Sequence, residues 1–334
     1  MIGKDNAMRV LVIGCGSIGM RHMHNLNNLG IDDLMAFDTV ADQREHAQQE
    51  CGARPFDTLD AALQSGADVV FVTTPTHLHV PVALQAASAG CHLFIEKPLS
   101  HTEEGLNELI DLVQRNHLVT MVGCNMRFHP GPSILKKLLE ARVIGTIIAA
   151  RLQAGSFLPR WRPSQDYRQS YSASAEWGGA ILDAIHEIDL ALWFLGPARL
   201  LASAHLPAWT IGLKADGLSE MILQHTSGAL SSIHLNFVQR DYRRACQLIG
   251  SEGTLYWDYE THVVHQYGPD GNLSLSYPEP AGWQVNQMYL DELVYFVEAL
   301  KGSNQTMNSV DESLAALEIA LAARSHNSAD WTQP

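Results

Sequence analysis

Several kinds of feature are missing from this sequence, and each absence excludes a class of protein. Its 334 residues include only five cysteines, which are scattered and show no Cys-x-x-Cys spacing, so neither a disulfide framework nor a metal site is expected. No run of about 18 apolar residues occurs, and residues 1–6 hold no apolar stretch of the signal-peptide type. We therefore expect a cytoplasmic protein without a membrane span and without a bound metal ion.

Positive charge is also scarce. The chain has 22 lysines and arginines against 36 aspartates and glutamates, a net charge of −14, which argues against nucleic acid or an anionic membrane as a partner. The apolar share of 46% is that of an ordinary globular protein. At 334 residues the chain is too long for one small core, so two domains are expected.

A glycine motif is the most informative feature that the sequence does have. Apolar residues 10–13 run directly into Gly14, Gly16 and Gly19, in the pattern Gly-x-Gly-x-x-Gly. A buried strand that turns through glycines into a helix offers a dinucleotide pyrophosphate close backbone approach and free N–H groups. The next apolar run ends in Asp38, where a carboxylate can accept hydrogen bonds from the ribose of NAD and would repel the 2′-phosphate of NADP. NAD is therefore the favoured cofactor.

Apolar strand-like runs alternate with helix-like segments from residue 10 to residue 124. The expected strands are residues 10–13, 34–37, 68–74, 92–96 and 118–122, and the expected helices are residues 17–29, 58–64, 80–89 and 102–116. Thr102 is expected to cap the last of these helices. This alternation predicts a parallel sheet covered on both faces, so residues 1–124 are assigned to a Rossmann-type dinucleotide-binding domain.

The pattern changes after residue 124. A helix is expected at 133–141, followed by strands at 146–152, 200–205, 218–225, 229–237, 245–249, 254–258 and 262–267, and by closing helices at 287–300 and 311–324. Alternating apolar and polar residues with short turns predict a large, mostly antiparallel open sheet with one exposed or oligomer-forming face. Residues 125–334 are assigned to this α+β substrate-binding domain, with closing helices that could pack back on the first domain. The fold class is α/β.

Glu96-Lys97-Pro98 stands at the carboxyl end of a predicted parallel strand, where ligands of open α/β sheets bind. Lys97 is placed to meet the nicotinamide end of the cofactor and to favour loss of a proton from a substrate hydroxyl. Pro98 stiffens the exit of the strand and is a candidate for a cis peptide bond. Taken alone, a lysine after a strand is more often an ordinary surface residue.

A second segment, 177–196, begins with Trp-Gly-Gly and continues as an expected amphipathic helix. Asp183, His186 and Asp189 are spaced by three, so they are expected to share one broad helical face. A histidine between two carboxylates can act as a general base near neutral pH. The alternative is a partly buried polar cluster on a core helix.

Polar residues follow two further strand ends. Asn125 and Arg127, just after the last Rossmann strand, could contact the substrate or tie the domains together. Residues 74–77, Thr-Pro-Thr-His, could line the cofactor. His77 and His79 resemble a metal pair only superficially, because no third ligand accompanies them at a suitable spacing. They are interpreted as loop or helix-start residues.

The segment 158–171 gathers three arginines and three aromatic residues in a chain that is otherwise poor in positive charge. Arginine forks suit phosphate or carboxylate groups, and aromatic faces suit sugar or base rings. An anionic substrate is expected, such as a sugar phosphate, a uronic or sialic-type acid or a nucleotide sugar. The alternative is an arm that grips a neighbouring subunit.

Taken together, five motifs resemble the family of glucose–fructose oxidoreductase, inositol dehydrogenase and MocA. They are residues 14–19, 74–77, 96–98 (Glu-Lys-Pro), 125–128 (Asn-x-Arg-Phe) and 178–189 (Gly-Gly…Asp…His-x-x-Asp). The resemblance covers nearly the whole chain in the family's order, and Glu-Lys-Pro is its most specific motif. It implies NAD(P)-dependent oxidation or reduction of a sugar, cyclitol or related polyol, by a homodimer or homotetramer assembled through the second sheet.

The resemblance also implies roles for single residues. Lys97 would bind and polarise the reacting oxygen, His186 would be the acid/base, and Asp183 a substrate or relay residue. Many members place the aspartate four residues before the histidine, whereas here the spacing is three, so Glu187 or Asp189 could take that role instead. Two other activities stay open, an NAD-assisted glycoside hydrolase of the same family and a non-catalytic NAD-binding sensor.

These arguments give two sets of candidate residues besides the catalytic Lys97, His186 and Asp183. The cofactor-binding candidates are Gly14, Gly16, Ser17, Ile18, Gly19, Asp38, Thr74, Pro75, His77, Glu96, Lys97 and Asn125. The substrate-binding candidates are Arg127, Arg160, Trp161, Arg162, Tyr167, Arg168, Asp183 and His186.

Overall fold

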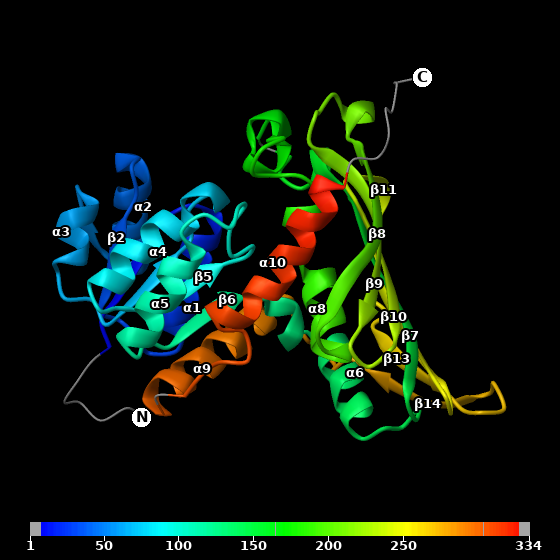
Figure 1. Ribbon diagram of the computed structural model, residues 1–334. Coiled ribbons are helices and arrows are strands. Elements are labelled where there is room, and N and C mark those ends of the chain that lie inside the picture. Colours follow the sequence, from blue (N-terminus) through cyan, green and yellow to red (C-terminus); the bar gives the residue numbers. More distant parts are fainter. Residues whose placement is uncertain (1–7, 164, 303, 327–334) are drawn as a thin grey trace. The chain divides into compact units, whose positions relative to one another are not determined.

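The computed structural model describes residues 8–163, 165–302 and 304–326 (Figure 1). The chain divides into two compact units, Met1–Cys124 with Asn286–Leu314 and Asn125–Val285 with Ala315–Pro334. Each unit contains a sheet of its own. Residues 1–6 and Ser164, on which two of the sequence arguments drew, lie outside the described residues.

The sheet of the first unit is parallel throughout. Its strands are β1 (Val10–Ile13), β2 (Leu34–Phe37), β3 (Arg54–Phe56), β4 (Val69–Val72), β5 (His92–Glu96) and β6 (Thr120–Gly123). The order is β3-β2-β1-β4-β5-β6, which confirms the predicted Rossmann-type sheet. β1 and β4 contain only buried residues, as expected for strands covered on both faces. The strand order reverses between them, and ligands bind outside the carboxyl ends of the strands at such a point.

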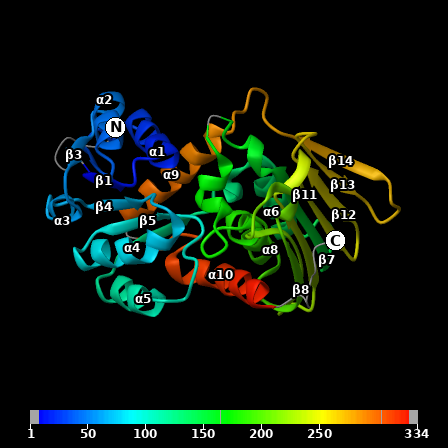
Figure 2. The ribbon, with the colours of Figure 1, turned by 90° about the horizontal axis from the view of Figure 1, so that it is seen from above.

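Helices lie on both faces of this sheet. They are α1 (Ser17–Asn28), α2 (Ala41–Cys51), α3 (Leu59–Leu63), α4 (His79–Ser88), α5 (Leu106–Arg115) and α9 (Asn286–Gly302). Figure 2 shows α1 and α9 on one face and α4 and α5 on the other. The predicted cap at Thr102 is wrong, because Gly105 adopts a left-handed φ of +75° and α5 begins only after it. Helix α2 was not predicted, since its only buried residues are Ala47 and Cys51.

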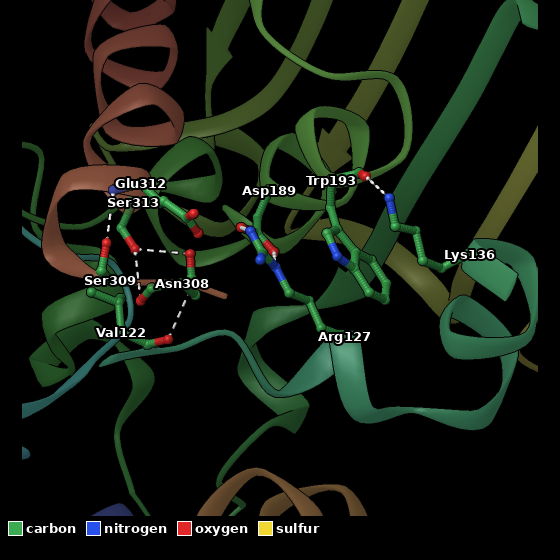
Figure 3. A network of polar contacts seen from close by, with 9 residues as sticks. All are labelled: Val122, Arg127, Lys136, Asp189, Trp193, Asn308, Ser309, Glu312 and Ser313. Carbon is green, nitrogen blue, oxygen red and sulfur yellow. Dashed lines mark hydrogen bonds and ion pairs between the residues drawn. The ribbon is translucent and has the colours of Figure 1, made fainter. Parts of the chain in front are cut away.

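The closing segment 286–314 belongs to the first unit, whereas the sequence analysis assigned it to the second domain, with closing helices that could pack back on the first. The Phe296 ring of α9 packs edge-on against Phe94 on β5, with ring centroids 5.5 Å apart. Asn308 donates a hydrogen bond from Nδ2 to the carbonyl oxygen of Val122 on β6, at 2.8 Å (Figure 3). Aromatic packing and hydrogen bonds to a distant strand, neither visible as a local pattern, hold this segment in place.

The sheet of the second unit has eight strands. They are β7 (Ile147–Phe157), β8 (Ala198–Pro207), β9 (Asp216–His225), β10 (Leu230–Asn236), β11 (Val238–Gly250), β12 (Thr254–Asp258), β13 (Val263–Tyr267) and β14 (Leu273–Pro278). Their order is β14-β13-β12-β11-β7-β10-β9-β8, and only the β7–β10 pair is parallel, so the mostly antiparallel sheet is confirmed. β14 was not predicted, although its residues Leu273, Leu275 and Tyr277 alternate with serines, and it is exposed along most of its length.

The second unit carries its helices on one face of this sheet. Figure 2 shows α6 (Pro130–Glu140) and α8 (His186–Leu195) on that face. A single turn, α7 (Ala180–Asp183), precedes α8, and α10 (Val310–Ser325) closes the described chain. No helix among the described residues combines the length and the apolar character that crossing a membrane requires.

Candidate active site

The three motif glycines of the first unit have different surroundings. A Cβ atom at Gly14, whose φ is +99°, would lie 2.7 Å from the backbone of Thr73. A Cβ at Gly19 would lie 2.0 Å from the carbonyl oxygen of Gly14. At Gly16, by contrast, a Cβ would have no heavy atom within 4 Å. Gly14 and Gly19 are therefore required by packing, whereas Gly16 faces open space that a ligand can enter.

The start of α1 offers unpaired backbone N–H groups beside these glycines. Gly16 is the N-cap of α1 and no side chain caps it, and the first turn, which holds Ser17 and Ile18, has no acidic residue. The Asp38 carboxylate accepts hydrogen bonds from the backbone N–H of Cys15, at 2.8 Å, and of Val40, at 2.9 Å. These residues fit NAD, with the helix N-terminus for its pyrophosphate and Asp38 for its ribose.

A buried histidine joins two loops at the carboxyl end of this sheet. The ring of His79 has Nε2 2.8 Å from the carbonyl oxygen of Thr74 and Nδ1 2.8 Å from that of Pro98. Burial lowers the pKa of His79, and a neutral ring donates to only one of the two carbonyl oxygens. His79 thus connects the Thr74 loop to the Lys97 loop, a role that the interpretation as a helix-start residue missed. The Lys97–Pro98 peptide bond is cis, as the sequence indicated.

The Glu96 side chain points into the first unit, toward α1. Its Oε1 lies 2.7 Å from Nε2 of the fully buried His22, and its Oε2 accepts a hydrogen bond from the backbone N–H of Lys97 at 3.2 Å. Burial disfavours the charged carboxylate, but His22 and Lys97 outweigh this and lower the pKa of Glu96. The structure therefore gives the predicted cofactor contact Glu96 a partner within the protein. His22 carries no recognisable motif, so the sequence offered no signal for this pairing.

Arg127, a predicted substrate contact, forms a buried ion pair in the second unit (Figure 3). Its Nε and Nη2 donate to the Asp189 carboxylate at 2.9 and 2.6 Å, and the two side chains are only 7% and 4% exposed. The Arg127 guanidinium also lies 5.6 Å from the centre of the Trp193 ring. Asn125 begins the same short helical turn, Asn125–Phe128. A bidentate pair of this kind fixes α8 against that turn.

The single helix expected after the Gly-Gly pair is broken, which corrects the prediction of one shared helical face. Ala184 leaves the helical region, with φ −96° and ψ 33°, so Asp183 ends α7 and His186 begins α8. The Asp216 carboxylate caps α7 by accepting a hydrogen bond from the backbone N–H of Ile181, at 2.8 Å. A long-range cap therefore sets this first turn.

Asp216 also explains the second glycine of the pair. Gly179 has a φ of +95°, and a Cβ there would lie 2.0 Å from an Asp216 carboxylate oxygen. Arg324 of α10 lies 3.6 Å from the same carboxylate and donates to the backbone carbonyl of Ala175 at 2.7 Å. Burial raises the pKa of Asp216, although Ile181 and Arg324 oppose the rise. The sequence gave no sign that a β9 residue caps this helix.

The three carboxylates near His186 have different partners. Glu187 pairs with Arg244 of β11, with Nε and Oε1 2.7 Å apart, and Asp189 pairs with Arg127 as described above. Asp183 instead accepts a hydrogen bond at 2.7 Å from the hydroxyl of Tyr171, a neutral group. His186 and these three acids are all buried. Two of the acids are thus paired with arginines, and the third accepts a hydrogen bond from a phenol.

The arginine-rich segment 158–171 contacts its own unit. Arg160 donates to the carbonyl oxygen of Arg240 at 3.3 Å, Trp161 to Ser156 at 3.0 Å, and Tyr167 to the carbonyl oxygen of Ile211 at 2.9 Å. The Arg168 guanidinium lies 4.7 Å from the centre of the Tyr167 ring. A cavity of about 20 Å³, lined in part by Trp161, Arg162 and Tyr167, has room for a water molecule and not for a sugar.

Comparison with known proteins identifies the family. A model described as an oxidoreductase family with an NAD-binding Rossmann fold matches residues 8–124, and a model of the GFO/IDH/MocA C-terminal domain matches residues 134–256. The chain belongs to this oxidoreductase family. Its N-terminal domain is accordingly an NAD-binding Rossmann domain.

Named relatives are dehydrogenases of sugars and cyclitols. The chain is 27% identical to myo-inositol 2-dehydrogenase of Thermotoga maritima over 336 residues, which cover 95% of each chain. It is 29% identical to levoglucosan dehydrogenase of Pseudarthrobacter phenanthrenivorans. That alignment spans 219 residues and covers 58% of this chain and 55% of that one. A solved structure of levoglucosan dehydrogenase with NADH and levoglucosan matches with a TM-score of 0.84, covering 95% of this chain and 97% of that one. At 20% identity this likeness shows the fold.

Proposed function

We propose that the protein transfers a hydride between NAD and a secondary hydroxyl or keto group of a sugar, sugar derivative or cyclitol. The observation that carries this proposal is the carboxyl edge of the first sheet. There the open face of Gly16 follows β1, Asp38 follows β2 and Lys97 follows β5. The family and its named dehydrogenases of myo-inositol and levoglucosan support the substrate class.

The proposed mechanism assigns one step to each residue. NAD, when bound, supplies the acceptor for the hydride of the carbinol carbon. The imidazole of His186 takes the hydroxyl proton, since histidine exchanges protons near neutral pH. The ammonium group of Lys97 stabilises the negative charge that develops on the oxygen, and a carbonyl group results. The hydride leaves carbon and the proton leaves oxygen, so the oxidation balances.

Among the three carboxylates, we assign the role beside His186 to Asp183. Glu187 and Asp189 are buried and each is paired with an arginine, so moving either would leave an uncompensated charge. Asp183 accepts a hydrogen bond from the Tyr171 hydroxyl, which holds its carboxylate in place, and a carboxylate so held can orient an imidazole or a substrate hydroxyl. This supports Asp183 despite its unusual spacing from the histidine.

The test of the function is NADH formation from NAD⁺ with a panel of neutral and anionic sugars, cyclitols and nucleotide sugars. We expect turnover of one class, and a kcat reduced by at least about a hundredfold in Lys97→Ala with NAD binding retained. Lys301→Ala, an exposed lysine that pairs with Glu298 on α9, is the control and should keep wild-type kcat. Glycoside cleavage without net NADH would favour the hydrolase, and NAD binding without turnover the sensor.

We further propose that the substrate is anionic and meets the exposed guanidinium groups of Arg162 and Arg168. Arg162→Ala should then raise KM for an anionic substrate by about tenfold and leave KM for a neutral analogue unchanged. Arg199→Ala, an exposed arginine on β8, is the matched control. Dissociation of an oligomer with unchanged KM would instead make segment 158–171 a subunit arm.

We also propose that the protein is cytoplasmic and forms a homodimer or homotetramer through its second sheet. The support for this assembly is a set of exposed apolar side chains on strands of that sheet, namely Ile148, Leu201, Ile222, Leu230, Leu273 and Leu275. Such side chains are typical of a surface that a partner covers. Light scattering of wild type and of Ile148→Lys with Ile222→Lys tests it, because the two lysines should shift the mass toward the monomer.

A further inference from the structure

Segment 158–171 ends in a residue that the sequence analysis left out of the site. Tyr171 opens the short helical turn Tyr171–Ala173, and its hydroxyl donates to Oδ1 of Asp183 at 2.7 Å. Asp183 is 5% exposed, so water competes little for this hydrogen bond. The contact joins the loop before the Gly-Gly pair to the last residue of α7.

The backbone holds Tyr171 firmly in this position. A Cβ at Gly178 would lie 2.2 Å from the carbonyl oxygen of Tyr171, so the first glycine of the pair is required by this close approach. The backbone N–H of Gly179 donates to the carbonyl oxygen of Ser172 at 3.1 Å. The absence of side chains at the Gly-Gly pair therefore allows two close contacts. The Tyr171 backbone packs against Gly178, and the Asp216 carboxylate packs against Gly179.

The neighbouring tyrosine provides a contrast. The hydroxyl of Tyr167 donates to the backbone carbonyl of Ile211, a neutral group, at 2.9 Å. Two tyrosines four residues apart thus make hydrogen bonds of similar length, one to a carboxylate and one to a peptide. A hydrogen bond to a charged acceptor contributes more than one to a neutral acceptor.

We infer that Tyr171 is a positioning residue, which fixes the Asp183 carboxylate in the orientation that serves His186. The inference rests on the proposed function of Asp183. We expect the phenol to act on the reaction through Asp183, so its loss should lower kcat while the affinity for NAD stays unchanged. A residue with a merely structural role would instead change stability without this selective loss of kcat.

The test compares Tyr171→Phe with Tyr277→Phe, which removes a hydroxyl that donates to Gln266 of β13 at 2.9 Å, outside the proposed site. We expect Tyr171→Phe to lower kcat by about tenfold, with the affinity for NAD within about twofold of wild type. Tyr277→Phe should keep wild-type kcat. In the Asp183→Ala background, adding Tyr171→Phe should lower kcat no further, because the carboxylate on which it acts is gone.

Wild-type kcat in Tyr171→Phe overturns the inference, as do losses that multiply in the double variant. A thermal melt of each variant identifies one that fails to fold, and Asp183→Asn then probes the same pair from the other side. Turnover in the wild type that Lys97→Ala removes upholds the proposed function whatever Tyr171→Phe does. A wild type without turnover on any substrate refutes the proposed function first.

Discussion

The two units hold their proposed site residues by different means. In the first unit the glycine turn is a matter of backbone geometry, with Gly14 at φ +99° and Gly19 against the Gly14 carbonyl. In the second unit the site residues are held by side chains from distant strands, such as Arg244 on Glu187 and Asp216 on the start of α7. A backbone turn tolerates changes around it, whereas paired buried charges depend on both partners.

The largest effect is expected when the Arg127–Asp189 pair is broken. Arg127→Ala leaves a buried carboxylate without a counter-charge and should lower the free energy of unfolding by about 3–5 kcal/mol. The double variant Arg127→Met with Asp189→Leu removes both charges and should recover most of that loss. Urea unfolding measures both. Equal destabilisation by the single and double variants would contradict the view that charge pairing holds this unit.

A smaller effect is expected from a buried histidine of the second unit. Burial, with Arg244 and His262 nearby, lowers the pKa of His129 to about 3. An unfolded histidine titrates near pH 6.5, so the unfolded state binds more protons and stability is lost as pH falls from about 6.5 toward 3. The slope should approach about 1.4 kcal/mol per pH unit from this group.

Urea unfolding of wild type and His129→Asn between pH 8 and pH 4 measures this slope. The Nδ1 of His129 accepts the backbone N–H of Gly131 and caps α6, and asparagine keeps an acceptor at the cap without the titration. The variant should therefore lose stability less steeply below pH 6.5. Parallel curves for the two proteins would show that another group causes the acid sensitivity.

The smallest effect on stability is expected in the glycine turn of the first unit. Gly16→Ala adds a methyl group where no heavy atom lies within 4 Å, at an ordinary φ of −69°. Its melting temperature should match wild type, while its affinity for NAD falls by about tenfold because the methyl group occupies the space of the pyrophosphate. Gly19→Ala should instead lower the melting temperature, because its methyl group would collide with the carbonyl oxygen of Gly14. Calorimetric titration of both variants with NAD measures the loss of affinity, and thermal melts measure the loss of stability.

Prediction from sequence succeeded where structure depends on neighbouring residues. The strand bounds Val10–Ile13, Leu34–Phe37 and His92–Glu96 agree with the predicted ranges, because continuous apolar runs are typical of buried parallel strands. It failed at α2, which buries few side chains and so shows no periodic signal, and it missed β14, whose short alternation of leucines and serines lies on an exposed strand. It also failed at Ala184, where the chain leaves the helix within a run that otherwise looks helical.

The sequence by itself determined the cofactor turn, the two sheets and the residue types that could carry acid–base chemistry. Its glycine spacing is a local requirement of backbone conformation and close packing. Only the tertiary structure decided which partners the carboxylates of the second unit have, because Arg127 and Asp189 are 62 residues apart and Ile181 and Asp216 are 35 apart. Strand order brings such partners together, and side-chain pairing across that distance leaves no periodic trace in the sequence.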